Sequence, residues 1–97
     1  MVVIAKRAIN EFIEANPRSA KSLLEWYLKT KESDWKCFAD IKKGFGATDS
    51  VGNDLYVFNI GGNKYRLITR IIFGARTVFI RFIGTHKAYD KVNLSEL

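Results

Sequence analysis

Hydrophobic residues in the first part of the chain recur with the spacing of an amphipathic helix. Residues 1–4 are mostly β-branched and predict a short strand. The apolar residues that follow fall at i, i+3, i+4 and i+7, on one helical face, and are Ala5, Ala8, Ile9, Phe12 and Ile13. Asn16-Pro17 ends this helix, because a residue before proline disfavours helical backbone, and Pro17 begins the next one.

A second helix, beginning at Pro17, is predicted to form a hairpin with the first. Its apolar stripe consists of Ala20, Leu23, Leu24, Tyr27 and Leu28. Trp26 and Trp35 fall in helical patterns and are interpreted as core or helix-interface residues. A third, short helix follows Ser33-Asp34 and ends at Gly44, with Cys37 predicted to be a buried apolar residue. Residues 44–54 are rich in glycine and polar residues and predict a loop.

Beyond this loop the hydrophobic period changes from 3.6 to two. Residues 55–60, 64–73 and 76–84 are rich in Tyr, Val, Phe and Ile and are separated by glycine-containing turns. They predict three antiparallel strands joined by hairpins. The fold class is therefore α+β, with N-terminal helices packed on one face of a small antiparallel β-sheet. For residues 91–97, a final edge strand and a short helix are both compatible with the sequence.

The turn between the last two strands determines which side chains share a face. A two-residue type II′ turn at Gly74-Ala75 pairs positions whose numbers sum to 149. The face towards the helices then carries Tyr56, Phe58, Ile60, Tyr65, Leu67, Thr69, Ile71, Phe73, Val78, Ile80 and Phe82. The opposite face carries Lys64, Arg66, Ile68, Arg70, Ile72, Thr77, Phe79, Arg81 and Ile83. Basic residues from two strands therefore converge on one surface.

Composition indicates one folded domain spanning residues 1–97. The chain has 97 residues, 47% hydrophobic and 27% charged, which is enough apolar material for a globular core. No apolar run approaches the ~18 residues that span a bilayer. Lys6-Arg7 directly after an apolar start is the reverse of a signal peptide, and the single cysteine permits no internal disulfide. The sequence therefore predicts a cytoplasmic protein that does not bind membranes.

Charge is distributed unevenly along the chain, although the formal net charge is only +6. The segment 61–91 contains a single acidic residue, Asp90, against seven basic ones, which are Lys64, Arg66, Arg70, Arg76, Arg81, Lys87 and Lys91. A localised excess of positive charge favours a polyanionic partner. The partner-facing chemistry is therefore expected in this part of the chain.

Arg66, Arg70 and Arg81 are the candidate phosphate ligands of the basic face. Guanidinium groups match phosphate oxygens bidentately, and Phe79 or Ile83 between them can support a base or a sugar. A solvated sheet face without a ligand is the alternative interpretation of these arginines.

The segment Gly84–Asp90 places the only histidine, His86, and Tyr89 at the end of the basic face. The predicted pairing brings His86 close to Lys64 and Arg66. Histidine and tyrosine act in proton transfer and arginine holds an anionic transition state, a combination that suits phosphodiester cleavage without a metal. One histidine, one cysteine and scattered carboxylates provide no metal-ligand spacing.

Two segments carry a resemblance to a known family. Residues 57–68 (VFNIGGNKYRLI) and 78–91 (VFIRFIGTHKAYDK) resemble the HigB toxins of bacterial type II toxin–antitoxin modules, as do Ser33–Lys36 and the two leading helices. The resemblance implies a RelE-like fold and mRNA endonuclease activity, usually on translating ribosomes. It also implies a cognate HigA-like antitoxin as partner, mRNA and the ribosome as targets, and DNA contact only through the toxin–antitoxin complex.

The same resemblance assigns expected roles to individual residues. Lys64, Arg66 and Arg81 occupy the basic strand positions, and His86 and Tyr89 occupy the C-terminal proton-transfer positions. We expect catalysis by His86, Tyr89, Arg66 and Arg81, and RNA binding by Lys64, Arg70, Phe79 and Lys87. No cofactor and no metal are implied. The competing hypothesis is a non-catalytic RNA- or ribosome-binding module that uses the same face.

The surface that binds the antitoxin is predicted on the helical hairpin. Trp26, Tyr27 and Leu28 form a stripe that is broader than one packing face requires. A partly exposed aromatic patch of this kind suits a stable protein partner. Direct coverage of Arg66 and Arg81 by acidic side chains is the alternative.

Overall fold

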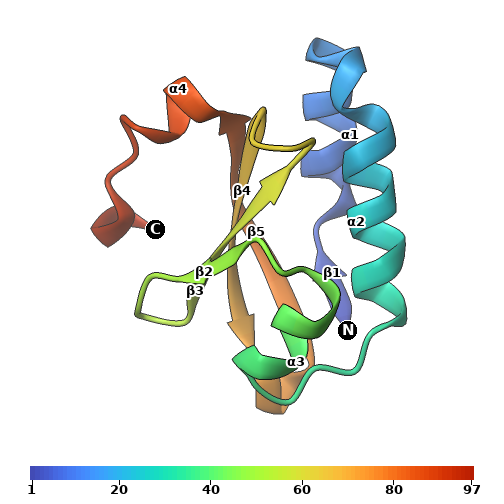
Figure 1. Cartoon of the computed structure of the whole chain (residues 1–97), viewed down its shortest axis with the longest axis vertical. Helices are drawn as coiled ribbons and strands as arrows, with labels where there is room; N and C mark the ends of the chain where they lie inside the picture. Colours follow the sequence, from blue (N-terminus) through green and yellow to red (C-terminus); the bar gives the residue numbers. More distant parts are fainter.

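The computed structural model describes all 97 residues, and Figure 1 shows their arrangement. The strands are β1 (Val2–Ile4), β2 (Thr48–Ser50), β3 (Leu55–Ile60), β4 (Tyr65–Ile72) and β5 (Thr77–Thr85). The α-helices are α1 (Lys6–Ala15), α2 (Ala20–Glu32), α3 (Phe38–Gly44) and α4 (His86–Tyr89). Three 3-10 turns complete the chain, η1 (Pro17–Ser19), η2 (Phe73–Ala75) and η3 (Leu94–Glu96).

The strands form one sheet in the order β1-β5-β4-β3-β2. Neighbouring strands are antiparallel, except that β1 runs parallel to β5 and pairs Val3 with Val78. The helical hairpin α1–α2 lies on one side of this sheet, and the chain from α4 onwards lies on the other (Figure 1). We call the side opposite the hairpin the outer face. The predicted α+β architecture is confirmed, with a mixed rather than a wholly antiparallel sheet.

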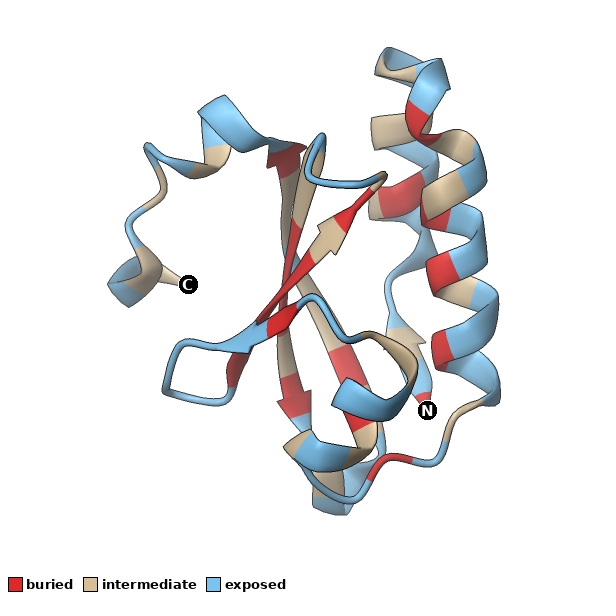
Figure 2. Ribbon diagram, viewed as in Figure 1, coloured by how far each residue is buried: buried red, intermediate tan, exposed pale blue.

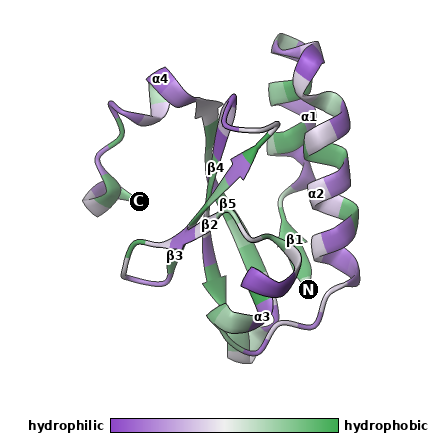
Figure 3. Cartoon of the chain, viewed as in Figure 1, coloured by the Kyte–Doolittle hydropathy of each residue, from purple (hydrophilic) through white to green (hydrophobic).

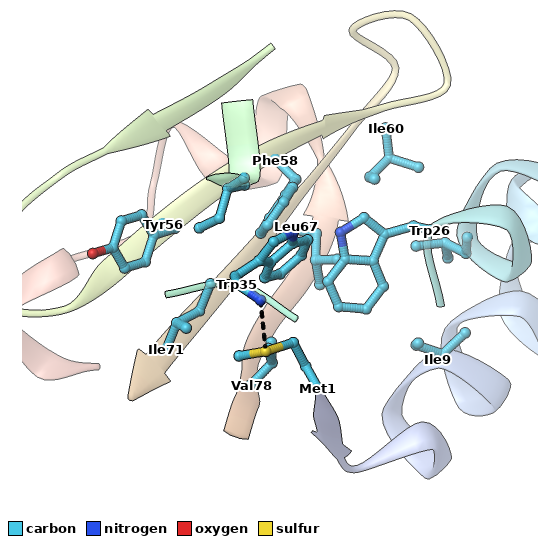
Figure 4. Close-up of a cluster of buried hydrophobic side chains, with 12 residues drawn as sticks. Met1, Ile9, Trp26, Trp35, Tyr56, Phe58, Ile60, Leu67, Ile71 and Val78 are labelled. Carbon is cyan, nitrogen blue, oxygen red and sulfur yellow. Dashed lines mark hydrogen bonds between the residues drawn. The ribbon is translucent and has the colours of Figure 1, made fainter. Parts of the chain in front are cut away.

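The main core lies between the hairpin and the sheet. Buried positions concentrate on β3, β4 and the sheet-facing side of α2 (Figure 2). Phe58 is central, with its ring beside those of Trp26 and Trp35 (Figure 4), at centroid distances of 5.4 and 6.2 Å. The ring of Phe45 lies 5.4 Å from it. Phe58 meets Trp26 and Phe45 edge to face and stacks with Trp35, and both arrangements add to the energy of apolar burial. Trp26 and Trp35 are therefore core residues, as the sequence indicated.

The N-terminus connects the sheet to the end of α2. The Met1 side chain is buried, and its Sδ accepts a hydrogen bond from the Trp35 backbone N–H at 3.4 Å (Figure 4). The Met1 ammonium donates to the carbonyls of Lys31 and Ser33, where the negative end of the α2 dipole favours a cation. Burial, assisted by the nearby Arg76 charge, lowers the pKa of this ammonium.

The buried face of α2 differs from the predicted stripe. Leu23, Trp26 and Thr30 point into the core, whereas Leu24 and Leu28 are exposed, Leu28 by 57%. Polar and apolar residues are mixed around the helix (Figure 3). The stripe predicted from the spacing of the apolar residues therefore lies to one side of the face that is buried. Of the predicted antitoxin-binding stripe, Trp26 is buried and only Leu28 and half-buried Tyr27 remain at the surface.

The pairing of β4 with β5 follows the predicted register only near the turn. Ile72 pairs with Thr77 and Arg70 with Phe79, both sums being 149, but beyond an irregularity at Ile68/Thr69 the sums become 150. Arg81 is the residue skipped by the pairing, so β5 carries a bulge there. A one-residue shift moves every later side chain of the strand to the opposite face of the sheet. The predictions for Phe82 and Ile83 were therefore wrong, because Phe82 packs on the outer face and Ile83 packs against the main core.

Three further expectations were wrong in detail. The connection between β4 and β5 is η2 followed by Arg76 in the left-handed region (φ 52°), not a two-residue type II′ turn. The predicted loop 44–54 contains β2, which pairs with β3 at the sheet edge. Cys37 is exposed because it stands at the N-cap of α3 in extended conformation, outside the apolar face of that helix.

The outer face carries a second, smaller apolar cluster. Leu55, Val57 and Ile68 are buried there. Side chains from β5 and the last part of the chain cover them, namely Phe82, Tyr89, Val92, Leu94 and Leu97. The segment 91–97 thus ends in the short helical turn η3 and lies across the outer face, which settles the choice between a strand and a helix. None of the helices has the length and apolar character needed to cross a membrane.

Candidate RNA interface and active site

The short helix α4 positions His86 and Tyr89 directly after β5. Thr85 is its N-cap, with Oγ1 accepting a hydrogen bond from the Ala88 N–H at 3.1 Å. Gly84 is required at the junction, because a Cβ there would lie 2.5 Å from the Phe82 ring and 3.3 Å from Ala88 Cβ. The spacing i, i+3 then places His86 and Tyr89 on adjacent positions of one helical side. This helix was not expected from the sequence.

A basic end of the outer face forms where α4 meets the β3–β4 turn, and consists of Lys64, Arg66, His86, Lys87 and Tyr89. The backbone N–H of His86 donates to the Lys64 carbonyl at 3.2 Å. The Arg66 guanidinium lies over the Tyr89 ring, 5.9 Å from its centroid, a cation–π arrangement. The predicted proximity of His86 to Lys64 is therefore observed, and the contact that the structure gives Arg66 in this region is with Tyr89.

Asp90 is a neighbour of His86 to which the sequence analysis assigned no role. His86 Nδ1 lies 3.4 Å from Asp90 Oδ2, and the imidazole is about half exposed, at 53%. A carboxylate at Nδ1 orients the ring and directs Nε2 away from the carboxylate. The i, i+4 spacing of His86 and Asp90 is the sequence signal that indicates this pair once a helix is assumed.

Arg70 and Arg81 form a separate arginine pair on the same face. Nη2 of Arg70 and Nη2 of Arg81 donate to the main-chain oxygen of Leu97 at 2.9 and 3.1 Å. Arg70 lies four residues from Arg66 along β4, about 13 Å at ~3.3 Å per residue. Arg66, Arg70 and Arg81 therefore share the outer face as predicted, but Arg81 joins Arg70 and not the basic end.

The other two predicted RNA-binding residues differ in their surroundings. Lys87 is exposed on α4 beside His86. Phe79 is half-buried, pairs with Arg70 across the sheet, and is flanked by Ile4 of β1 on its other side. Phe79 therefore belongs to the region of the arginine pair and is distant from His86 along β5.

The electrostatics of the outer face favour an anionic ligand. The salt bridges of the chain are formed by Arg7, Lys43, Arg76 and His86 with nearby carboxylates. Lys64, Arg66, Arg70 and Arg81 form no salt bridge with an Asp or Glu side chain, so no acidic side chain neutralises their positive charges. No three His, Cys, Asp or Glu side chains are grouped to hold a metal ion.

Comparison with known proteins identifies the class to which this fold and site belong. Residues 19–92 match the family model described as HigB_toxin, a RelE-like toxic component of a toxin–antitoxin system. The chain is 31% identical over 94 residues to the mRNA interferase HigB of Escherichia coli O6:H1, covering 95% of this chain and 91% of that protein. It is 28% identical over 92 residues to the mRNA interferase toxin HigB of Escherichia coli K12, covering 93% of this chain and 88% of that protein. The same identity and coverage hold for the mRNA interferase HigB of Shigella flexneri.

The chain belongs to the RelE-like HigB toxin family. It is thus the toxic component of a toxin–antitoxin system, which implies an antitoxin as its protein partner.

Proposed function

We propose that this toxin is an endoribonuclease that cleaves mRNA at the basic end of its outer face, in the cytoplasm and on the translating ribosome. The observation that carries the proposal is the meeting of His86, Tyr89 and Arg66 at the α4–β4 junction. The names of the relatives, which describe mRNA interferases, support the same reaction. A cognate HigA-like antitoxin would silence it, and DNA would be contacted only by the toxin–antitoxin complex.

The proposed reaction is an intramolecular transesterification. The ribose 2′-OH attacks the adjacent phosphorus, so that an O2′–P bond forms and the P–O5′ bond breaks. One proton passes from the 2′-OH to a base and another passes to the departing 5′ oxygen, leaving a 2′,3′-cyclic phosphate and a 5′-OH. At neutral pH an imidazole suits the base and a phenol suits the proton donor. Arg66 would hold the equatorial oxygens of the phosphorane transition state, and Asp90 would orient the His86 ring.

The function is tested by mapping new 5′ ends on a translated mRNA after induction of the toxin. We expect discrete ends with the wild-type protein and their loss with His86→Ala, because removal of the imidazole removes a proton-transfer group. Lys21→Ala, an exposed substitution on α2, is the matched control and should leave the ends unchanged. If growth arrest and ribosome association persist without any new 5′ ends in the wild type, the protein is the non-catalytic binding module.

We expect cleavage to survive EDTA. The acidic and histidine side chains are not grouped as metal ligands, and the arginines supply the positive charge that a metal would otherwise provide. The measurement is the initial rate on isolated RNA with excess toxin, because ribosomes themselves require Mg²⁺. Loss of cleavage on chelation that is restored by a divalent ion would contradict the metal-free mechanism.

A further inference from the structure

One edge of β5 is only partly covered by a neighbouring strand. β1 pairs with β5 from Thr77 to Phe79, and after Ile4 the chain leaves the sheet and enters α1 (Figure 1). From Ile80 to Thr85, β5 therefore has β4 on one side and no strand on the other. An edge of this kind presents backbone N–H and C=O groups with which another chain can pair.

The backbone groups of Ile83 point to this open edge. The N–H of His86, at the end of β5, donates to the Lys64 carbonyl at 3.2 Å, so the ladder with β4 continues to this residue. Backbone groups alternate between the two sides of a strand, so Ile83 and Leu67 face each other as a non-hydrogen-bonded pair. β1 does not reach Ile83, and no turn or loop group hydrogen-bonds to its backbone. Its N–H and C=O are therefore available to a further strand.

A groove of about 410 Å³ lies beside this edge, between β5 and α1. Its lining on β5 consists of four consecutive residues, 80–83. Consecutive side chains alternate between the two faces of a sheet, so a groove contacts all four only along the edge of the strand. The lining on α1 has the spacing i, i+3, i+4 and i+7 of one helical side and consists of Ala8, Glu11, Phe12 and Ala15. The two alanines have short side chains, which leaves room between the helix and the strand.

An extended polypeptide matches this groove in shape and in hydrogen bonding. Strand addition supplies main-chain hydrogen bonds to an open edge, while alternate side chains of the added strand contact the surfaces beside it. The groove offers apolar surface from Phe12 and Ile80, and its acidic residue, Glu11, is already paired with Arg7 at 2.9 Å. The net charge of +6 attracts an acidic partner and repels a second copy of this chain.

We propose that an extended, acidic segment of the antitoxin adds to the sheet as a strand beside residues 80–85 of β5, in the groove lined by α1. The antitoxin is the protein partner that the toxin family implies, so the inference does not depend on the proposed nuclease activity. This groove is a different surface from the one that Tyr27 and Leu28 form on α2. Main-chain hydrogen bonds to the edge of β5 provide affinity, and the apolar lining selects the side chains of the segment.

The first test measures binding of the purified, full-length cognate antitoxin to the toxin and its variants. Ala15→Trp places an indole in the groove from an exposed position of α1, so it should lower antitoxin affinity at least tenfold, about 1.4 kcal/mol. Asn10→Trp places the same side chain on the far side of α1 and is the matched control, for which we expect a change of less than about twofold. Thermal unfolding of both variants checks that each is folded.

Hydrogen exchange at the Ile83 amide is a second test, on the wild-type protein. In the free toxin this amide should exchange faster than those of Phe82 and Gly84, which pair with β4, and antitoxin should slow it at least tenfold. The inference is overturned if Ala15→Trp binds the antitoxin as the wild type does, or if the antitoxin does not slow exchange at Ile83. It is also overturned if this amide becomes protected in the free toxin as the toxin concentration rises, because the occupant is then a second copy.

Discussion

His86→Gln and Tyr89→Phe are each expected to slow mRNA cleavage by about a hundredfold or more, the usual scale of lost general acid–base catalysis. Each substitution keeps most of the side-chain volume and removes the group that transfers a proton. RNA and ribosome binding should change little, because Arg66, Lys64 and Lys87 remain in place. The measurement is the single-turnover rate on a labelled mRNA in ribosome complexes, with ribosome binding determined separately.

Tyr89→Phe is the more informative of the two variants. Its ring packs on the outer cluster and lies under Arg66, so phenylalanine preserves both contacts and only the hydroxyl is lost. A large fall in rate would therefore report chemistry and not folding. If both variants cut within a few-fold of wild type, neither residue transfers the proton, and the arginines or a group from the ribosome must carry the reaction.

Much of this site was predictable because it depends on local patterns. Turn residues and period-two alternation located β3, β4 and β5. Side chains an even number of residues apart on a strand share a face, which placed Arg66 and Arg70 together. The proximity of His86 to Lys64 followed from the hairpin register. The bulge shifts the pairing of β4 with β5 by only one residue, so the two residues remain neighbours. Long-range pairing of β1 with β5 was not predictable, since three β-branched residues specify no partner.

The parts that were missed share a physical cause. Residues 78–83 are all apolar apart from Arg81, so both faces of this part of β5 are hydrophobic. A shift of one residue therefore leaves its hydrophobic pattern equally plausible. The bulge at Arg81 is therefore invisible in the sequence, although it decides which of Phe82 and Ile83 is in the core. The docking of residues 91–97 also depends on tertiary contacts that seven residues of mixed polarity do not encode.

Trp26→Ala is expected to destabilise the toxin by about 3–5 kcal/mol, the usual cost of removing a large aromatic side chain from a core. Trp26 is 1% exposed and contacts Phe58 edge to face beneath the hairpin. The substitution leaves a cavity where α2 meets the sheet. Equilibrium unfolding in urea measures the effect, with Leu28→Ala as the control on the exposed side of the same helix, where a change of less than about 0.5 kcal/mol is expected.

Trp26→Phe separates the contribution of packing from that of the indole N–H. Trp26 Nε1 is buried without a hydrogen-bond partner, and an orphaned donor of this kind costs about 1–3 kcal/mol. Phenylalanine keeps much of the ring and removes the donor, so we expect it to recover most of the stability lost in Trp26→Ala. If Trp26→Phe were as destabilising as Trp26→Ala, the shape of the indole and not its burial would hold the hairpin on the sheet.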